Sequence, residues 1–273
     1  MALKYRHELK YVVSAQQIAV LRSRIRYIMD LDEHVGEEGK YTIRSAYFDD
    51  YRNTCYFENE NGTSPREKFR IRIYDASDKE IHLELKRKDS GKTHKDSCSL
   101  TRGQCEAFLE GADFVGIKER IICLPVAEGM PEQNIPLAKG QKRLAGNEEK
   151  EYIPENYPPV FRKFCLKYQS ELYRPKVIVE YDREPYICRN GNVRVTFDTN
   201  IRSSNCVDDF FEKKIFARPV MPSGYHLMEV KYDEFLPDYI YNGLQMENLQ
   251  QATFSKYYLC RKYNIGGVRR NGI

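Results

Sequence analysis

Basic side chains alternate with apolar ones along the run EKFRIRIYD, from Glu67 to Asp75. Lys68, Arg70 and Arg72 occupy every second position, with Phe or Ile between them. Because successive side chains of a β-strand point to opposite faces, this strand would have one cationic and one apolar face. A cationic row can hold phosphates, since guanidinium groups donate paired hydrogen bonds to phosphate oxygens and ammonium groups act as point charges.

A second pattern, Glu-x-Lys, occurs in three other strand-like runs. Each pair places a carboxylate and an ammonium about 7 Å apart on one face of a strand, with apolar residues on the other face. A single pair of this kind is also typical of the solvated face of an antiparallel sheet, where mixed charges aid solubility. The pairs are Glu8 and Lys10, Glu84 and Lys86, and Glu229 and Lys231.

Strands must position most of these residues. Alternating runs predict strands at 5–13, 41–50, 67–75, 80–88, 93–100, 174–186, 192–200 and 225–234. Helical spacing and capping residues predict helices at 14–29, 102–111, 160–170, 238–248 and 253–264. We therefore expect an α+β fold, an antiparallel β-barrel or tunnel of about eight strands with flanking helices. Residues 1–273 would form a single domain with an irregular or helical insertion at about 119–170.

The charged strand faces, taken together, favour an interior location. A barrel of this size would pack its apolar faces under the helices and line its lumen with the charged faces. Ionised groups are too costly to bury dry and unpaired, so this lumen needs water, metal ions and a polyanion. Basic residues outnumber acidic ones in it, which predicts a chain of phosphates as the occupant. The carboxylates would hold a divalent cation, which prefers oxygen ligands.

Composition excludes several other classes of protein. The 273 residues carry a formal net charge of +4, too small an excess to indicate a nucleic-acid binder. No run approaches the roughly 18 apolar residues of a membrane helix, and the charged N-terminus lacks the apolar core of a secretion signal. The eight cysteines form no C-x-x-C pair, so neither zinc nor a redox motif is indicated. We expect a cytoplasmic location with free thiols.

Seven segments in their order resemble the VTC-type polyphosphate polymerase domain of the triphosphate tunnel metalloenzyme (CYTH-like) superfamily. The resemblance spans roughly residues 3–263. It depends on four motifs that follow one another along the chain in the order R-x-R-x-Y, L-E-x-K, Y-x-R and M-E-V-K-Y. The segments are YRHELKYVV, YTIRSAYFDD, EKFRIRIYD, IHLELKRK, VIVEYDREPY, NVRVTFDT and LMEVKYD. The resemblance implies a β-barrel tunnel that transfers the γ-phosphoryl group of a nucleoside triphosphate, with ATP expected, onto polyphosphate. It also implies Mn²⁺ or Mg²⁺ as the cofactor. Polyphosphate or pyrophosphate would be the other ligand. The sequence does not indicate any protein partner.

Site residues are carried over by position in these motifs. The resemblance implies that Arg70, Arg72, Arg183 and Arg194 act on the transferred phosphate. It implies substrate binding by Lys10, Lys86, Lys88, Lys95, Tyr181, Lys231 and Lys256. Glu229 resembles the metal-binding glutamate, and Glu8 and Glu84 are further candidate ligands.

Three alternative functions remain open from the sequence. A triphosphatase or tripolyphosphatase could use the same tunnel, but that branch carries E-x-E-x-K where this chain has Arg6, Glu8 and Lys10. The cation at position 6 favours the polymerase. A non-catalytic polyphosphate-binding module is the second alternative, although pure anion binding gains nothing from a buried glutamate. A basic barrel that binds nucleic acid would need exposed aromatic residues among the bases.

Overall fold

The computed structural model of the chain describes residues 5–36, 38–111, 157–246 and 248–268. Its main feature is one antiparallel sheet in which eight strands follow a single path. In path order these are β1 (His7–Ser14), β10 (Tyr225–Tyr232), β8 (Val193–Ser204), β7 (Arg174–Cys188), β3 (Tyr41–Asp49), β4 (Arg66–Tyr74), β5 (Ser77–Asp89) and β6 (Lys92–Ser99). Two short strands lie off the path, with β2 (Asp30–Leu31) on β7 and β9 (Arg218–Pro219) on β8.

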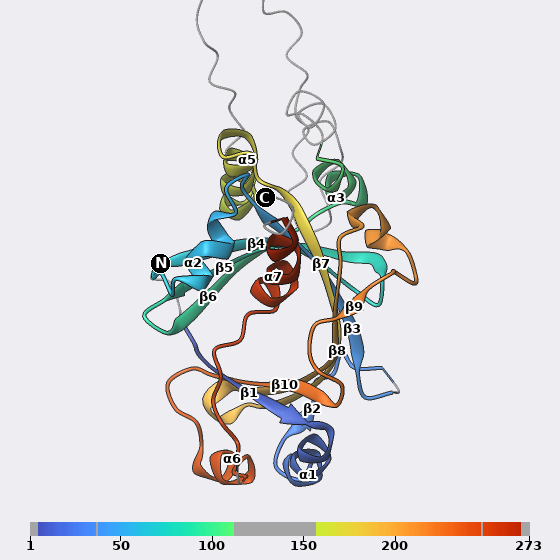
Figure 1. Cartoon of the computed structure of the whole chain (residues 1–273). Helices are drawn as coiled ribbons and strands as arrows, with labels where there is room; N and C mark the ends of the chain where they lie inside the picture. Colours follow the sequence, from blue (N-terminus) through green and yellow to red (C-terminus); the bar gives the residue numbers. More distant parts are fainter. Residues whose placement is uncertain (1–4, 37, 112–156, 247, 269–273) are drawn as a thin grey trace, which may run out of the picture.

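The sheet curls until its two edges approach each other. Figure 1 shows β1 and β10 at the bottom, β7, β8 and β3 on the right, and β4, β5 and β6 at the upper left. The edges meet where the backbone N–H groups of Arg6 and Thr93 each donate to the other's carbonyl at 2.9 Å. The expected antiparallel, barrel-like α+β fold is therefore confirmed, as a half-barrel whose edges join at this bridge.

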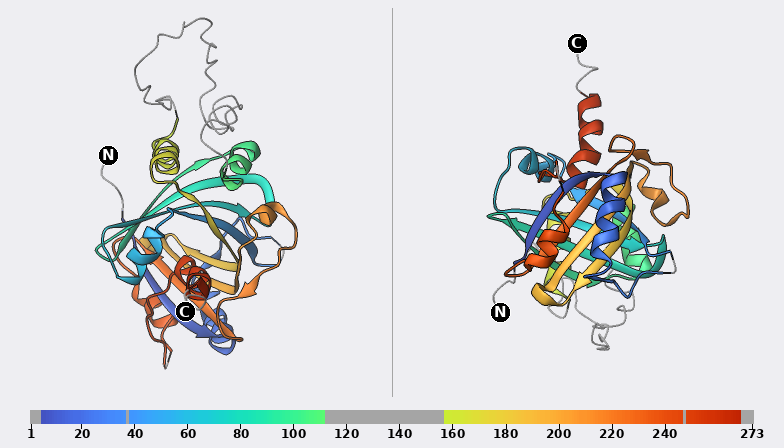
Figure 2. Two further views of the ribbon diagram at one scale, coloured as in Figure 1. Left: turned by 45° about the horizontal axis from the view of Figure 1, so that its top comes forward. Right: turned by 90° about the horizontal axis from the view of Figure 1, so that it is seen from below.

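Helices flank both sides of the curled sheet. Helices α1 (Ala15–Ile25) and α6 (Asp238–Gly243) lie beneath β1 and β10, while α3 (Arg102–Leu109) and α5 (Pro159–Ser170) lie at the opposite end (Figure 1). Helix α7 (Lys256–Val268) stands at one open end of the half-barrel (Figure 2), close to α2 (Thr54–Glu60). Two 3₁₀ turns, η1 (Asn190–Asn192) and η2 (Val207–Phe211), complete the described elements. No helix in these ranges is long and apolar enough to cross a membrane.

Local sequence signals explain the positions of the helices. Ser14 caps α1 with a capping box, since its side chain accepts from Gln17 N–H while the Gln17 side chain accepts from Ser14 N–H. Thr101 and Gln104 repeat this arrangement at α3. Both helices begin where predicted, whereas α2 was not predicted. Residues 119–156 of the expected insertion lie outside the described residues, and its last part forms α5.

Two apolar cores lie outside the curl, between the sheet and the helices. Phe69, Ile71 and Ile73 of β4 are fully buried, and the Phe69 ring lies 5.1 Å from the ring of Phe164 on α5. On the other side, Ile18, Leu21 and Ile25 of α1 pack on the outer face of β1, β8 and β10. Since the apolar face of β4 faces outward to the helices, its cationic row faces inward.

Candidate functional site

The inner face of the sheet surrounds a strongly basic cavity of about 370 Å³. This volume lies within the range of small-ligand sites. Among the described residues that line it, only Glu8 and Glu229 are acidic, against ten basic side chains. The basic residues are Lys10, Arg66, Lys68, Arg70, Arg72, Lys86, Lys88, Arg183, Lys231 and Lys256.

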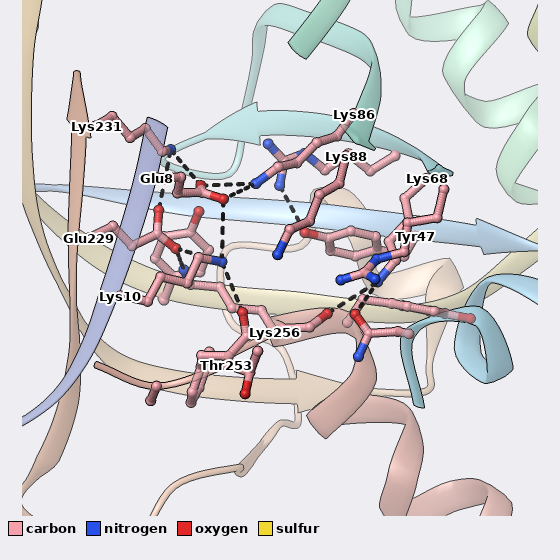
Figure 3. Close-up of a pocket in the computed structure, with 18 of the residues that line it drawn as sticks. Glu8, Lys10, Tyr47, Lys68, Lys86, Lys88, Glu229, Lys231, Thr253 and Lys256 are labelled. Carbon is pink, nitrogen blue, oxygen red and sulfur yellow. Dashed lines mark hydrogen bonds and ion pairs between the residues drawn. The ribbon is translucent and has the colours of Figure 1, made fainter. Parts of the chain in front are cut away.

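Two of the Glu-x-Lys motifs and the lysine of the third meet at one side of this cavity. Strands β1 and β10 are antiparallel, so Glu8 lies opposite Lys231, and Lys10 opposite Glu229. The Nζ atoms lie 3.4 and 3.6 Å from the facing carboxylates. From β5, Lys86 reaches across the curl and donates to both oxygens of Glu8 at 2.8 and 2.9 Å. The repeated motif is therefore a complementary set of charges (Figure 3).

Glu229 is the centre of a buried ionic network. Lys256, the first residue of α7, places its Nζ 2.8 Å from Glu229 and 2.6 Å from Asp198. Arg183 donates two hydrogen bonds of 2.7 Å to Asp198, and its guanidinium lies 3.6 Å from Glu229. Lys256 and Arg183 also lie over the face of the buried Tyr181 ring, at 4.6 and 5.2 Å from its centroid.

A second ionic group orients the arginines of β4. Arg70 donates to Glu84 at 2.7 Å and to the hydroxyl of Tyr47 at 2.8 Å. Arg72 lies 3.8 Å from Glu84 and donates to Tyr181 at 3.3 Å. Because Glu84 is almost fully buried and surrounded by cations, it fixes the direction of the guanidinium groups toward the cavity.

The charges of these groups follow from burial and from their neighbours. Burial alone would raise the pKa of Glu8 and Glu229, but the surrounding lysines lower both well below the usual value. Both glutamates therefore stay ionised at neutral pH. Burial lowers the pKa of Lys86 to about 7 although Glu8 opposes this shift, and it lowers the pKa of Lys68 to about 7 as well. Burial would lower the pKa of Lys256, but Asp198 and Glu229 raise it above its usual value. Lys256 therefore stays charged.

Most of the residues expected from the sequence come together here. Two of the four candidate catalytic arginines come from β4 and one from β7, and they line the cavity with most of the candidate substrate ligands. The expected residues that line the cavity are Glu8, Lys10, Arg70, Arg72, Lys86, Lys88, Tyr181, Arg183, Glu229, Lys231 and Lys256.

Three expected residues do not line the cavity. Arg194 instead pairs with Asp32 at 2.8 Å and donates to the Tyr41 hydroxyl at 3.0 Å. Lys95 is more than half exposed and pairs with Glu84 at 3.1 Å. Glu84 itself lies behind the arginines that it holds. Their proposed roles on substrate or metal are thus indirect in this arrangement.

Other lining residues were missed by the sequence prediction. Arg66 continues the cationic row of β4, and strand alternation alone could have found it; the sequence prediction includes Lys68 in this row but assigns it no role in the site. Asn59 comes from α2, and residues 251–255 from the loop before α7 close another side. This loop is fixed to β1 because Lys10 Nζ donates to the Phe254 carbonyl at 2.9 Å and Ala252 N–H donates to the Lys10 carbonyl at 2.8 Å.

The donor set bears on metal binding. No group of three or more His, Cys, Asp or Glu that could hold an ion occurs in the part of the chain that the structure describes. The cavity nevertheless offers two ionised carboxylates, Glu8 and Glu229, which both contact Lys10 and Lys231. Oxygen ligands fit Mg²⁺ or Mn²⁺. Two carboxylates do not complete a coordination shell, so a cation held here would need further oxygen ligands.

Comparisons with known proteins agree with this picture at the level of the family. The family model of the VTC domain matches residues 5–264. A search of curated proteins finds no match.

Solved structures that resemble this fold share little sequence with the chain. One is a candidate adenylate cyclase from Bacillus halodurans, with 11% identity and a TM-score of 0.39, covering 100% of this chain and 93% of that one. The protein PH1819 from Pyrococcus horikoshii OT3 has 11% identity and a TM-score of 0.40, covering 94% and 98%. A candidate adenylate cyclase from Vibrio parahaemolyticus has 7% identity and a TM-score of 0.46, also covering 94% and 98%.

Proposed function

The chain belongs to the VTC domain family, and from this premise we propose that it is a polyphosphate polymerase. It would transfer the γ-phosphoryl group of a nucleoside triphosphate, with ATP as the expected donor, onto the end of a polyphosphate chain. The transfer would depend on bound Mg²⁺ or Mn²⁺.

The observation that supports this proposal most is the composition of the cavity wall. Ten basic side chains and two ionised carboxylates surround the space, and no His or Cys is among the described lining residues. Ser255 is present, but its hydroxyl accepts from Tyr258 N–H at the start of α7 and from Lys68. Phosphoryl transfer needs positioning and charge neutralisation more than a protein nucleophile, and this wall suits that task.

The roles of the residues follow from their positions. Arg70 and Arg72, held by Glu84, would bind oxygens of the donor triphosphate with their fork of N–H groups. Lys10, Lys86 and Lys231 already lie beside the carboxylates, and would turn to phosphate oxygens when substrate enters. Arg183 and Lys256 would neutralise charge that develops on the transferred group. The attacking oxygen belongs to the terminal phosphate of the acceptor.

Glu229 and Glu8 would hold the divalent cation together with phosphate oxygens. When bound, the ion would neutralise charge on the phosphates between which the group moves. The carboxylates need no change of protonation for this, since both are ionised at neutral pH.

The environment of Arg6 favours the polymerase over a hydrolase. Its guanidinium forms an ion pair of 2.7 Å with Asp233 and does not line the cavity. The position that carries an extra glutamate in the hydrolytic branch thus adds no carboxylate here, which leaves fewer groups to activate water.

Product analysis tests the proposal. Purified protein with ATP and Mn²⁺, with and without a short polyphosphate primer, should give a ladder of lengthening polyphosphate together with ADP. Free phosphate without a ladder would show that the protein is a tunnel hydrolase. Phosphate binding without any turnover would leave a binding module and overturn the proposal.

A further inference from the structure

Three cations of the cavity wall have no carboxylate partner. Arg66 and Lys88 form no ion pair within 4.0 Å among the described residues, and neither does Lys68, which donates only to Asn59 at 2.9 Å and Ser255 at 3.2 Å. Arg66 donates to the Thr63 carbonyl at 2.9 Å. Every other lysine or arginine that lines the cavity contacts an acidic side chain.

The strand register brings these cations together. Arg66 of β4 lies directly opposite Lys88 of β5, and Lys68 lies opposite Lys86. Like charges in facing positions destabilise a sheet. Burial and the charge of Arg66 both lower the pKa of Lys68 and of Lys88. The arrangement is therefore unfavourable in the empty cavity and becomes favourable when an anion lies between the side chains.

The two sides of the cavity differ in charge. Figure 3 shows Glu8, Glu229 and Lys231 at one side, Lys68 and Tyr47 at the other, and Lys88 between them. A phosphate that carries a divalent cation belongs near the carboxylates, because they supply its oxygen ligands. A phosphate without a cation has most to gain beside Arg66, Lys68 and Lys88, because these basic side chains have no carboxylate partner among the described residues.

We propose that Arg66, Lys68 and Lys88 form an anion subsite for the metal-free phosphates of a linear polyphosphate chain. The subsite rests on the proposed function, in which it receives the acceptor while the metal-bearing nucleotide occupies the side of Glu8 and Glu229. Asn59 and Ser255 hold the Lys68 ammonium at the cavity surface. The metal-bearing nucleotide and the metal-free polyphosphate thus bind at different sides of one cavity, because only one side carries the carboxylates.

Calorimetric binding to the full chain tests this subsite. The probes are tripolyphosphate with excess EDTA, and Mn²⁺ with a non-hydrolysable ATP analogue. The variant is K68M/K88M, which keeps the apolar stems and removes two charges. Lys79 is exposed on the same strand β5 and does not line the cavity, so K79M is the control for charge alone.

We expect the wild-type chain to bind tripolyphosphate in EDTA and K68M/K88M to lose about a hundredfold or more in affinity. Binding of the Mn²⁺ nucleotide should change much less, and K79M should match the wild type in both measurements. The thermal unfolding midpoint of K68M/K88M should not fall below that of the wild-type chain, which excludes misfolding as the cause of the loss.

Three results would overturn the subsite. They are no metal-free binding by the wild-type chain, unchanged binding by K68M/K88M, and a loss that is equal for nucleotide and tripolyphosphate, which would place the nucleotide there instead. The product gel is independent of these measurements. A wild-type chain that only hydrolyses ATP, while its metal-free binding still depends on Lys68 and Lys88, would refute the polymerase and support the subsite.

Discussion

The ammonium of Lys256 lies 2.8 Å from a carboxylate oxygen of Glu229, joining the first turn of α7 to the strand β10. The same ammonium reaches Asp198 on β8 at 2.6 Å. Lys256 is nearly fully buried, as are both acids. Helix α7 is therefore part of the site, because its docking supplies the charge that compensates two buried carboxylates.

Removing this ammonium should damage both stability and turnover. In K256M, Glu229 and Asp198 lose a direct partner, so we expect the free energy of unfolding to fall by up to about 3–5 kcal/mol. Turnover should fall by about 10²–10³ if Lys256 neutralises charge on the transferred group. Urea denaturation and the product gel measure the two effects. K262M, which alters an exposed lysine of the same helix, is the control, and equal behaviour of the two variants would contradict the assignment.

The hydroxyl of Tyr257 fixes α7 to β3 by donating to the buried Asp49. Asp49 also accepts from the backbone N–H groups of Cys55 and Tyr56 in α2, so it links both helices to the sheet. We expect Y257F to lower the free energy of unfolding by about 1–3 kcal/mol, because Asp49 loses one donor while buried.

Turnover of Y257F should also decrease, since α7 carries Lys256 into the cavity. The neighbouring Tyr258 donates to the exposed Glu60, at 3.3 Å, so Y258F should change the free energy of unfolding by less than about 0.5 kcal/mol. Denaturant midpoints of the two variants provide the comparison. A Y257F protein as stable as Y258F would show that this hydrogen bond does not hold the helix.

The strand content and the direction of the charged faces could be predicted because they depend only on local alternation. The row containing Arg70 and Arg72 has a period of two, and the apolar residues between them must be buried. All eight strands of the path overlap their predicted runs, and the inward orientation of the cationic row follows from the same pattern.

Partners across the curl could not be predicted, because they depend on register and closure. Lys86 meets Glu8, 78 residues away, only because β6 returns to the start of β1. Arg194 shares the inner face of the sheet, yet it lies beside Asp32, which precedes β3. The short α2 lacks a strong helical period, so the contribution of Asn59 could not be found from the sequence.

The paired hydrogen bonds of Arg70 make a sharp prediction for the donor side of the cavity. R70A should lower turnover by about 10²–10³, because it removes a donor aimed at the phosphates and leaves Glu84 with fewer partners. R70K keeps the charge but loses the planar fork, so it should recover only part of the activity. Initial rates on ATP with primer separate the three proteins. R70A with most of the wild-type rate would remove Arg70 from the mechanism.

Glu229 should decide the metal dependence. E229Q keeps the shape of the side chain but removes the charge that faces Lys10, Lys231 and Lys256. We expect turnover to be lost over the whole range of a Mn²⁺ titration, whereas tripolyphosphate binding in EDTA should be retained or strengthened because the wall becomes more positive. An E229Q protein that reached the wild-type rate at higher Mn²⁺ would retain metal binding through another group, contrary to the assignment.

The lowered pKa of Lys68 predicts how stability depends on pH. Burial, together with the charges of Arg66 and Lys10, lowers this pKa from 10.5 to about 7, while Cys55 and Asp49 oppose the shift. Between pH 7 and about 10 the unfolded chain then holds a proton on Lys68 that the folded chain lacks, so the free energy of unfolding rises with pH, by up to about 1.4 kcal/mol per unit. Below pH 7 the folded state must bear the buried charge, and this part of the stability is lost.

Urea denaturation at pH 7, 8 and 9 should show this rise in the wild-type chain and a smaller rise in K68M. Lys86 also contributes to the rise in both proteins, so the difference between the two slopes is the quantity that reports on Lys68. Saturating tripolyphosphate should reduce the difference, because a bound anion stabilises the protonated ammonium. Equal slopes without the anion would show that Lys68 stays charged in the folded chain throughout this range, with its cost of burial already met by Asn59 and Ser255.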